Sequence, residues 1–159
     1  MRIAPFEPSE REAVVALALT AWSEVFDALR RELPPIAWSS FYPEGWEARQ
    51  SADIGALLDR EGALCRTAWR GDALAGFVAM RLHPADRMGE VHAIVVHPAH
   101  RVAGVASALM AHAEETFRRE GLSMSFAETG ADAGHVPARG LYEAAGYERW
   151  PVMRYVKAL

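Results

Sequence analysis

The stretch from Val95 to Ala106 constrains the fold of this chain more than any other part of it. A β-branched run ends at Pro98, an Arg-x-x-Gly-x-Ala segment follows at 101–106, and an amphipathic pattern comes directly after it. This order predicts a strand that leads to the N-terminus of a helix, where free backbone N–H groups and the positive end of the helix dipole face outward. Such a corner suits a pyrophosphate, because Gly104 and Ala106 keep bulky side chains away from it. The alternative interpretation is an ordinary strand-to-helix turn.

Length and charge exclude several classes of protein. The 159 residues fit one domain, 1–159, with a sizeable core, and the net charge of −4 without a basic run argues against nucleic-acid binding. A single cysteine, Cys65, excludes an internal disulfide, and its strand-like surroundings predict a buried thiol. The longest apolar stretch, 13–22, is too short to cross a bilayer, and the N-terminus lacks a signal-peptide pattern. We therefore expect a cytoplasmic protein.

Hydrophobic periodicity and turn residues predict a single mixed α/β (α+β) domain. A capping box at Ser9 and Glu12 begins the first helix, which must end at Pro34–Pro35, and an aromatic connector follows at 36–45. Further helices are expected at 46–60, after Gly104 and from Pro137 to Gly146, and strands at 2–6, 63–69, 73–82, 90–96, 122–127, 147–150 and 152–156. The expected fold is a central sheet of about six to seven strands flanked by about four helices.

Two titratable side chains, Glu90 and His92, lie on the strand that enters the corner. Period-2 alternation puts both on one face of that strand, where they could act on a proton. Glu90 could equally be a solvated residue at a strand entry, and His92 a histidine with satisfied hydrogen bonds. Tyr142, in the last helix, could be a packed aromatic.

Two segments resemble the GNAT superfamily of N-acetyltransferases. Residues 101–106 resemble its Arg/Gln-x-x-Gly-x-Gly/Ala acetyl-CoA signature, and residues 138–147 resemble its Ala-x-x-(Leu/Phe)-Tyr-x-x-x-Gly-(Phe/Tyr) segment. The resemblance covers nearly the whole chain and implies a GNAT-like domain that uses acetyl-CoA as co-substrate. It implies that the backbone of Ile94, Val95 and Val96 pairs with the pantetheine arm and the acetyl carbonyl. It also implies a pyrophosphate site formed by the backbone amides of Arg101, Val102, Ala103, Gly104, Val105, Ala106 and Ser107.

The same resemblance implies catalytic roles. Glu90 occupies the position of a general base that often acts through water, His92 a second position used for that purpose, and Tyr142 that of the acid which protonates the departing thiolate. His135 stands where many members have a cofactor-binding Asn, so this contact differs here. Val102 stands where the first Gly is usual, a change that a helix-entry position should tolerate.

Elementary chemistry agrees with direct acetyl transfer. An amine with a pKa near ~10.4 is protonated at neutral pH and must lose a proton, whereas a thiol with a pKa of about 8.5 leaves more readily with an acid nearby. Neither a nucleophilic side chain nor a metal is needed, and the six histidines are scattered without metal-ligand spacing.

The expected function is therefore acetyl transfer from acetyl-CoA to a primary amine. The alternative is a catalytically silent acyl-CoA-binding regulatory module; a nucleotide-binding domain would need a glycine-rich loop that is absent. Trp38, Tyr42 and Trp46 are candidates for the acceptor pocket, whereas Trp22 and Phe26 have the spacing of core residues. The expected partner is a small-molecule or peptide amine, without nucleic acid or membrane, and a homodimer stays an open option.

Overall fold

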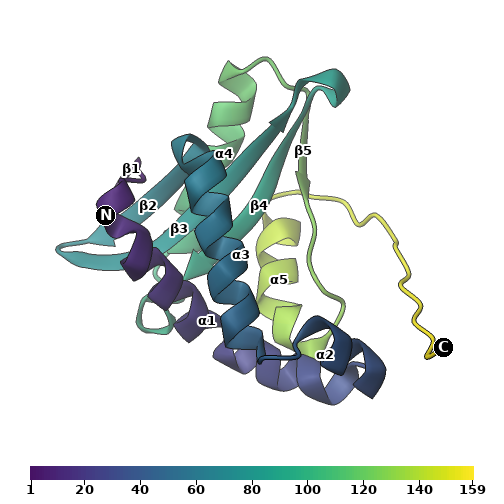
Figure 1. Cartoon of the computed structure of the whole chain (residues 1–159). Helices are drawn as coiled ribbons and strands as arrows, with labels where there is room; N and C mark the ends of the chain where they lie inside the picture. Colours follow the sequence, from purple (N-terminus) through teal and green to yellow (C-terminus); the bar gives the residue numbers. More distant parts are fainter.

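Five strands and five α-helices, described over all 159 residues in a computed structural model, form a sheet with helices on both faces (Figure 1). The strands are β1 (Arg2–Pro5), β2 (Cys65–Arg70), β3 (Ala73–His83), β4 (Met88–Val96) and β5 (Met124–Ala127). The helices are α1 (Arg11–Glu32), α2 (Pro35–Phe41), α3 (Trp46–Glu61), α4 (Val105–Arg119) and α5 (Val136–Ala144). None of these helices is long and apolar enough to span a bilayer.

The sheet follows the order of the strands in the chain, β1-β2-β3-β4-β5. Its first four strands are antiparallel, and β5 is parallel to β4 because the chain returns through the crossover helix α4. The β4–β5 pairing covers only Met88–Val91 against Met124–Ala127. The remainder of β4, from His92 to Val96, therefore has no strand beside it on that edge.

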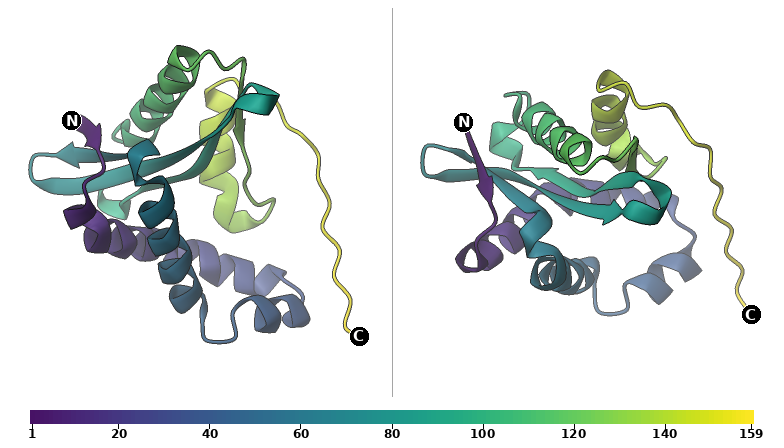
Figure 2. Two further views of the ribbon diagram at one scale, coloured as in Figure 1. Left: turned by 45° about the horizontal axis from the view of Figure 1, so that its top comes forward. Right: turned by 90° about the horizontal axis from the view of Figure 1, so that it is seen from above.

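Two hydrophobic clusters hold the helices against opposite faces of the sheet. In the α1-side cluster, Leu17 of α1 and Leu57 of α3 pack onto Phe77 and Val95 of the sheet. In the α4-side cluster, on the opposite face, Leu109 of α4 packs onto the sheet. Figure 2 shows the two layers, with α4 and α5 on one side and α1, α2 and α3 on the other. Side chains that alternate along β3 and β4 thus point into two different environments.

Helix α4 follows its predicted pattern. Val105, Leu109, Ala113 and Phe117 form one buried stripe facing the sheet, and Gly121 takes the positive φ of 71° that ends the helix. The corner at residues 101–106 leads into the N-terminus of this helix, and the apolar spacing of its residues predicts the buried stripe directly.

The prediction of six to seven strands was wrong, because the segments 147–150 and 152–156 do not form strands. Their alternating side chains suit a strand, but a strand also needs a neighbour that accepts its hydrogen bonds. After Tyr147 the chain instead continues as an extended tail that does not pair with the sheet (Figure 1). The Trp150–Pro151 step favours this extended path, since proline lacks an N–H and restricts the residue before it.

Two further details of the first half differ from the prediction. The connector at 36–45 contains the helix α2, because proline at the first turn starts a helix as well as ending the preceding one. This raises the number of α-helices from the expected four to five. The capping box is displaced from Ser9–Glu12: the Glu10 carboxylate accepts a hydrogen bond of 3.0 Å from the Glu7 N–H, because a 3-10 turn begins at Pro8.

Cys65 is buried at the start of β2, as its strand-like surroundings predicted. Burial, together with the charge of Glu61, raises the pKa of its thiol to about 11. The thiol is therefore protonated at neutral pH and packs as a small apolar group.

Candidate active site

Glu90 lies at the centre of a hydrogen-bonded network on β3 and β4. Its carboxylate is 2.7 Å from His83 Nε2 and 2.8 Å from His92 Nδ1. Arg81, the cross-strand partner of Glu90, bonds through Nε to the Glu61 carboxylate at the end of α3, at 2.7 and 2.8 Å. All five side chains therefore gather on the sheet face that α1 and α3 cover.

A β-bulge in β4 lies at His92, close to Glu90. Ala79 pairs with Ala93 and Met80 with Val91, so His92 is an extra residue with no partner on β3. The two side chains lie on one face, as alternation predicted, and are in direct contact. His92 is also the first β4 residue beyond the pairing with β5.

The pKa of the Glu90 carboxyl is lowered by its hydrogen-bond partners. Burial acts in the opposite direction and is the largest single influence, but it is outweighed by the hydrogen bonds from His92 and His83 and by the charges of His92 and Arg81. Glu90 is therefore ionised at neutral pH, and a carboxylate with a lowered pKa is a weak proton acceptor. The carboxylate contacts both histidine rings.

The contacts of His92 Nδ1 indicate which ring nitrogen is free. This atom lies 2.8 Å from Glu90 Oε1 and 2.9 Å from Arg81 Nη1. The carboxylate can only accept and the guanidinium can only donate, so the two contacts compete for Nδ1. We assign the hydrogen on Nδ1 to the ionised Glu90 carboxylate, because Arg81 already donates through Nε to Glu61. This tautomer, assigned from the network, leaves the lone pair on Nε2 available to accept a proton.

Sequence reasoning missed three members of this network, His83, Arg81 and Glu61. The signal for the first two was present: they alternate along the first strand of a hairpin whose second strand carries Glu90. Glu61 could not have been found, because it comes from a helix that the tertiary fold brings to the sheet. No group of three or more His, Cys, Asp or Glu side chains is placed to hold a metal ion.

Tyr142 lies on the opposite face of the sheet from Glu90. It packs with Tyr147 against the α4-side hydrophobic cluster, with the two ring centroids 5.7 Å apart. Burial, with a smaller contribution from Tyr147, raises the pKa of the Tyr142 phenol to about 12. The hydroxyl is therefore protonated at any physiological pH and can donate that proton.

The corner after β4 has the geometry of an anion site. Gly104 has φ of 77°, directly before α4, and a side chain there would meet no atom within 4 Å. The first bond of the helix runs from the Ala108 N–H to the Gly104 carbonyl at 3.0 Å, which leaves the N–H groups of residues 105–107 without an intrahelical partner. Open space in front of free amides and a positive helix end fits a pyrophosphate.

The Arg101 side chain connects this corner to α1. Its guanidinium donates to Glu24 at 2.8 Å and to the Ala21 carbonyl at 3.2 Å, both on α1. The side chain thus ties the loop to α1.

Val102 is the strained residue of the corner. Its φ of 53° lies in the left-handed region that a β-branched side chain rarely adopts, and the side chain is fully exposed. Val102 was expected at a helix entry, but α4 begins only at Val105, so residue 102 lies in the loop before the helix.

Val102→Gly should stabilise the protein. The left-handed conformation costs an L-residue roughly 1–2 kcal/mol, part of which is offset by the larger backbone entropy of glycine in the unfolded chain. We expect a net gain of about 1 kcal/mol and a melting temperature about 2–4 °C higher, measured by thermal unfolding. Val102→Ala retains a Cβ and should gain less; an unchanged or lower melting temperature for Val102→Gly would argue against the strain.

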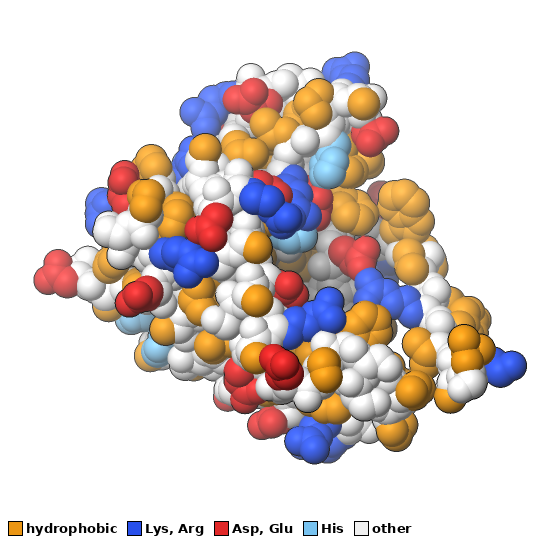
Figure 3. All heavy atoms as spheres, viewed as in Figure 1, with side chains coloured by type: hydrophobic (Ala, Val, Ile, Leu, Met, Phe, Trp, Pro, Cys, Tyr) orange, Lys and Arg blue, Asp and Glu red, His pale blue; other side chains and the backbone are white.

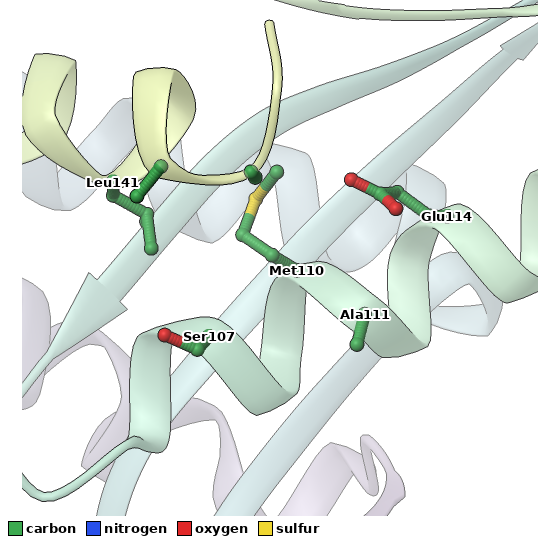
Figure 4. Close-up of a pocket in the computed structure, with 7 residues that line it drawn as sticks. Ser107, Met110, Ala111, Glu114 and Leu141 are labelled. Atoms are coloured by element: carbon green, nitrogen blue, oxygen red, sulfur yellow. The ribbon is translucent and has the colours of Figure 1, made fainter.

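A cavity of about 270 Å³ lies between α4 and α5, close to this corner (Figure 4). Its lining is mostly apolar, with Ser107 and Glu114 as the polar side chains, and the residues are Ser107, Met110, Ala111, Glu114, Leu141, Ala144 and Ala145. Ser107, predicted at the pyrophosphate, thus also borders a space between the two helices.

His135 stands at the N-cap position of α5, where its side chain makes no capping hydrogen bond. Its Nδ1 is 2.7 Å from Asp132 Oδ2, and Asp132 Oδ1 is buried without a hydrogen-bond partner. Arg139 donates to the carbonyls of Gly130 and Asp132 and fixes the same loop. Sequence reasoning missed Asp132, although a spacing of three residues before a histidine is a local signal.

The three candidate acceptor-pocket aromatics lie around Phe26, where α1, α2 and α3 meet. Trp46 stacks on Phe26 with centroids 4.4 Å apart, Tyr42 meets Phe26 edge-on at 5.4 Å, and Trp38 is 4.8 Å from Tyr42. Phe26 is buried, as predicted, and Trp22 packs against the α1-side cluster. None of these ring contacts involves His92 or Tyr142. Figure 3 shows a hollow in the middle of this side of the molecule, bordered by acidic, basic and histidine side chains.

Comparison with known proteins agrees with this architecture. Residues 22–147 match the Acetyltransferase (GNAT) family. The chain is 35% identical over 82 residues to the uncharacterized N-acetyltransferase YsnE of Bacillus subtilis (strain 168); the match covers 52% of this chain and 54% of that protein, so the chain spans about half of this relative.

Solved structures have the same fold. A GNAT-family protein from Desulfovibrio desulfuricans superposes with a TM-score of 0.72 at 21% identity, covering 96% of this chain and 89% of that one. The PaiA N-acetyltransferase of Thermoplasma acidophilum, in complex with coenzyme A, gives a TM-score of 0.68 at 13% identity, covering 90% and 87%. With the family match over most of its length, the chain belongs to the GNAT family of acetyltransferases.

Proposed function

We propose that this protein transfers an acetyl group from acetyl-CoA directly to a primary amine. The observation that carries the proposal is the position of the Glu90–His92 pair. It lies where β4 parts from β5, on one face of the sheet, while the protonated Tyr142 lies on the other. A thioester in the gap between the strands would have a proton acceptor on one side and a proton donor on the other.

The residues of the corner and of the free β4 edge suit the donor. The amides around Gly104 face open space at the N-terminus of α4 and can bind a pyrophosphate. The backbone of Ile94, Val95 and Val96 lies on an unpaired edge, where an extended pantetheine arm can add its amides like a further strand. His135, held by Asp132 at the start of α5, stays our candidate for a further contact with the donor. Coenzyme A bound to the PaiA relative supports the same class of donor.

Proton removal is assigned to the Glu90–His92 pair. As the amine nitrogen forms its bond to the acetyl carbonyl carbon, its proton passes to His92 Nε2, directly or through one water. Glu90 holds the ring through Nδ1 and stabilises the positive charge that then forms on it. His83 and Arg81 keep the carboxylate ionised and in place.

Proton delivery is assigned to Tyr142. When the bond between carbonyl carbon and sulfur breaks, the electron pair leaves with the sulfur, and the Tyr142 hydroxyl can give its proton to that thiolate. Its raised pKa keeps the hydroxyl protonated before the reaction. Trp38, Tyr42 and Trp46, at the junction of α1, α2 and α3, stay our candidates for contacts with the acceptor.

Release of free thiol from acetyl-CoA in the presence of a panel of primary amines tests this function. An enzyme releases thiol in step with an acetylated amine. A silent acyl-CoA-binding module binds acetyl-CoA in calorimetry but releases no thiol with any amine, and that result would replace the proposal with the binding function.

Glu90→Gln and His92→Gln should each lower turnover by about 10²–10⁴-fold while leaving the affinity for acetyl-CoA unchanged. His83→Gln, which removes only a neighbour of Glu90, is the matched control and should lose less. A silent Glu90→Gln beside an impaired His92→Gln would assign the role to His92 alone. Two silent variants would mean that the amine arrives already neutral.

A further inference from the structure

The ion pair between Arg81 and Glu61 is more buried than the other arginine–carboxylate pairs of the chain. Its side chains retain 27% and 23% of their accessible surface, whereas every other such pair has at least one side chain that retains 58% or more. A charge in a partly buried pair depends on its partner, because the water that would otherwise solvate it is displaced. Loss of Glu61 would therefore leave Arg81 in need of another carboxylate.

Arg81 lies between two carboxylates. Its Nε donates to Glu61 at 2.7 and 2.8 Å, and across the β3–β4 ladder it stands directly opposite Glu90. Side chains directly opposite each other on an antiparallel pair are close enough to interact, and the charge of Arg81 already helps to lower the pKa of the Glu90 carboxyl. Glu90 is therefore the carboxylate with which Arg81 can pair when Glu61 is removed.

The Nδ1 atom of His92 lies between two groups with opposite requirements. Glu90 Oε1, at 2.8 Å, accepts a hydrogen, and Arg81 Nη1, at 2.9 Å, donates one. A hydrogen on Nδ1 satisfies Glu90 and leaves the lone pair of Nε2 free, whereas a lone pair on Nδ1 satisfies Arg81 and places the hydrogen on Nε2. Only the first tautomer can accept a proton from an amine at Nε2. The competition between Glu90 and Arg81 thus decides whether His92 can act as a base.

We infer that Glu61 is a positioning residue, which selects the tautomer of His92 that can act as a base by holding Arg81. The inference rests on the proposed role of His92 in acetyl transfer. With Glu61 in place, the charge of Arg81 is compensated and the Glu90 carboxylate stays with the two histidines. Without Glu61, Arg81 forms a charge-assisted pair with Glu90. Glu90 then no longer accepts from Nδ1, Nδ1 accepts from Arg81 instead, and the hydrogen of the neutral ring lies on Nε2.

The tautomer of His92 in the free protein tests this inference without any substrate. Nitrogen-15 NMR of the histidine rings, at a pH of about 8.5 where an ordinary imidazole is neutral, distinguishes a ring nitrogen that carries hydrogen from one that does not. We expect the hydrogen on Nδ1 in the original chain and on Nε2 in Glu61→Gln, with the signals assigned by their loss in His92→Gln. Asp59→Asn, which removes the carboxylate of an exposed ion pair on the same helix, is the matched control and should keep the hydrogen on Nδ1.

Turnover separates this role from a merely structural role of the ion pair. Glu61→Gln should lower turnover by about 10²-fold or more, as expected for the loss of a general base, with unchanged affinity for acetyl-CoA. In Glu61→Gln/Arg81→Gln no guanidinium competes for Nδ1, so the hydrogen should return to Nδ1 and turnover should exceed that of Glu61→Gln by about 10-fold or more. If the pair only stabilised the fold, the double variant would be no more active than Glu61→Gln.

The two measurements also separate this inference from the proposed function. A hydrogen on Nδ1 in both the original chain and Glu61→Gln would overturn the inference, as would a hydrogen on Nε2 in the original chain. A double variant as impaired as Glu61→Gln would overturn it as well. The expected change of tautomer in a chain that releases no thiol with any amine would support the selection by Glu61 and contradict acetyl transfer.

Discussion

Gly104→Glu is expected to weaken binding of coenzyme A by at least about 100-fold. Gly104 precedes α4 with φ of 77°, and the space where its Cβ would lie is open within 4 Å. A glutamate there fills the space that phosphate oxygens would occupy and brings a negative charge to the same amides. Hydrogen bonds to charged groups contribute roughly 1.5–3 kcal/mol each, so losing one or two of them accounts for the expected decrease. Calorimetric titration with coenzyme A gives the dissociation constant directly.

Gly104→Gln is the matched control for charge. It has the same size as glutamate and the same strain at positive φ, so both variants should lose similar stability in thermal unfolding. Its affinity should lie between those of the original chain and of Gly104→Glu, and the difference between Gln and Glu should shrink as salt is added. A folded Gly104→Glu variant with normal affinity would show that the phosphates bind elsewhere.

Tyr142→Phe is expected to lower turnover by about 10²-fold or more while the affinity for acetyl-CoA stays unchanged. The substitution keeps the ring in the α4-side cluster and removes only the hydroxyl that would protonate the thiolate. An acyl donor with a more acidic thiol needs this proton less, so it should partly restore the rate. Steady-state thiol release with both donors measures the effect.

The pH dependence separates this role from a packing role. Burial raises the pKa of the Tyr142 phenol to about 12, so the hydroxyl is protonated throughout the neutral range and the fold-decrease should be constant there. In the unfolded chain a tyrosine ionises near pH ~10, so the folded protein should lose stability between that pH and about 12. Tyr147→Phe, in the adjacent ring, is the control and should retain turnover. Full activity of Tyr142→Phe with acetyl-CoA would exclude Tyr142 from the mechanism.

Local pattern determined the parts of the fold on which these predictions depend. The β-branched run, Pro98 and Gly104 predict the corner because each acts on its own backbone or on the next turn. The apolar stripe of α4 and the shared face of Glu90 and His92 follow in the same way from helical and strand periodicity. These features lie within one element or between two adjacent ones.

Tertiary structure alone decided the rest. The sequence could not show that β5 leaves β4 after Val91, that Glu61 would reach Arg81, or that Tyr142 and Glu90 would lie on opposite faces of the sheet. Nor could it show that 152–156, with a strand-like alternation, would not join the sheet. Strand pairing and helix docking depend on which distant surface buries a side chain or completes its hydrogen bonds. Several surfaces compete for each side chain, and the spacing of residues along the chain does not show which of them it packs against.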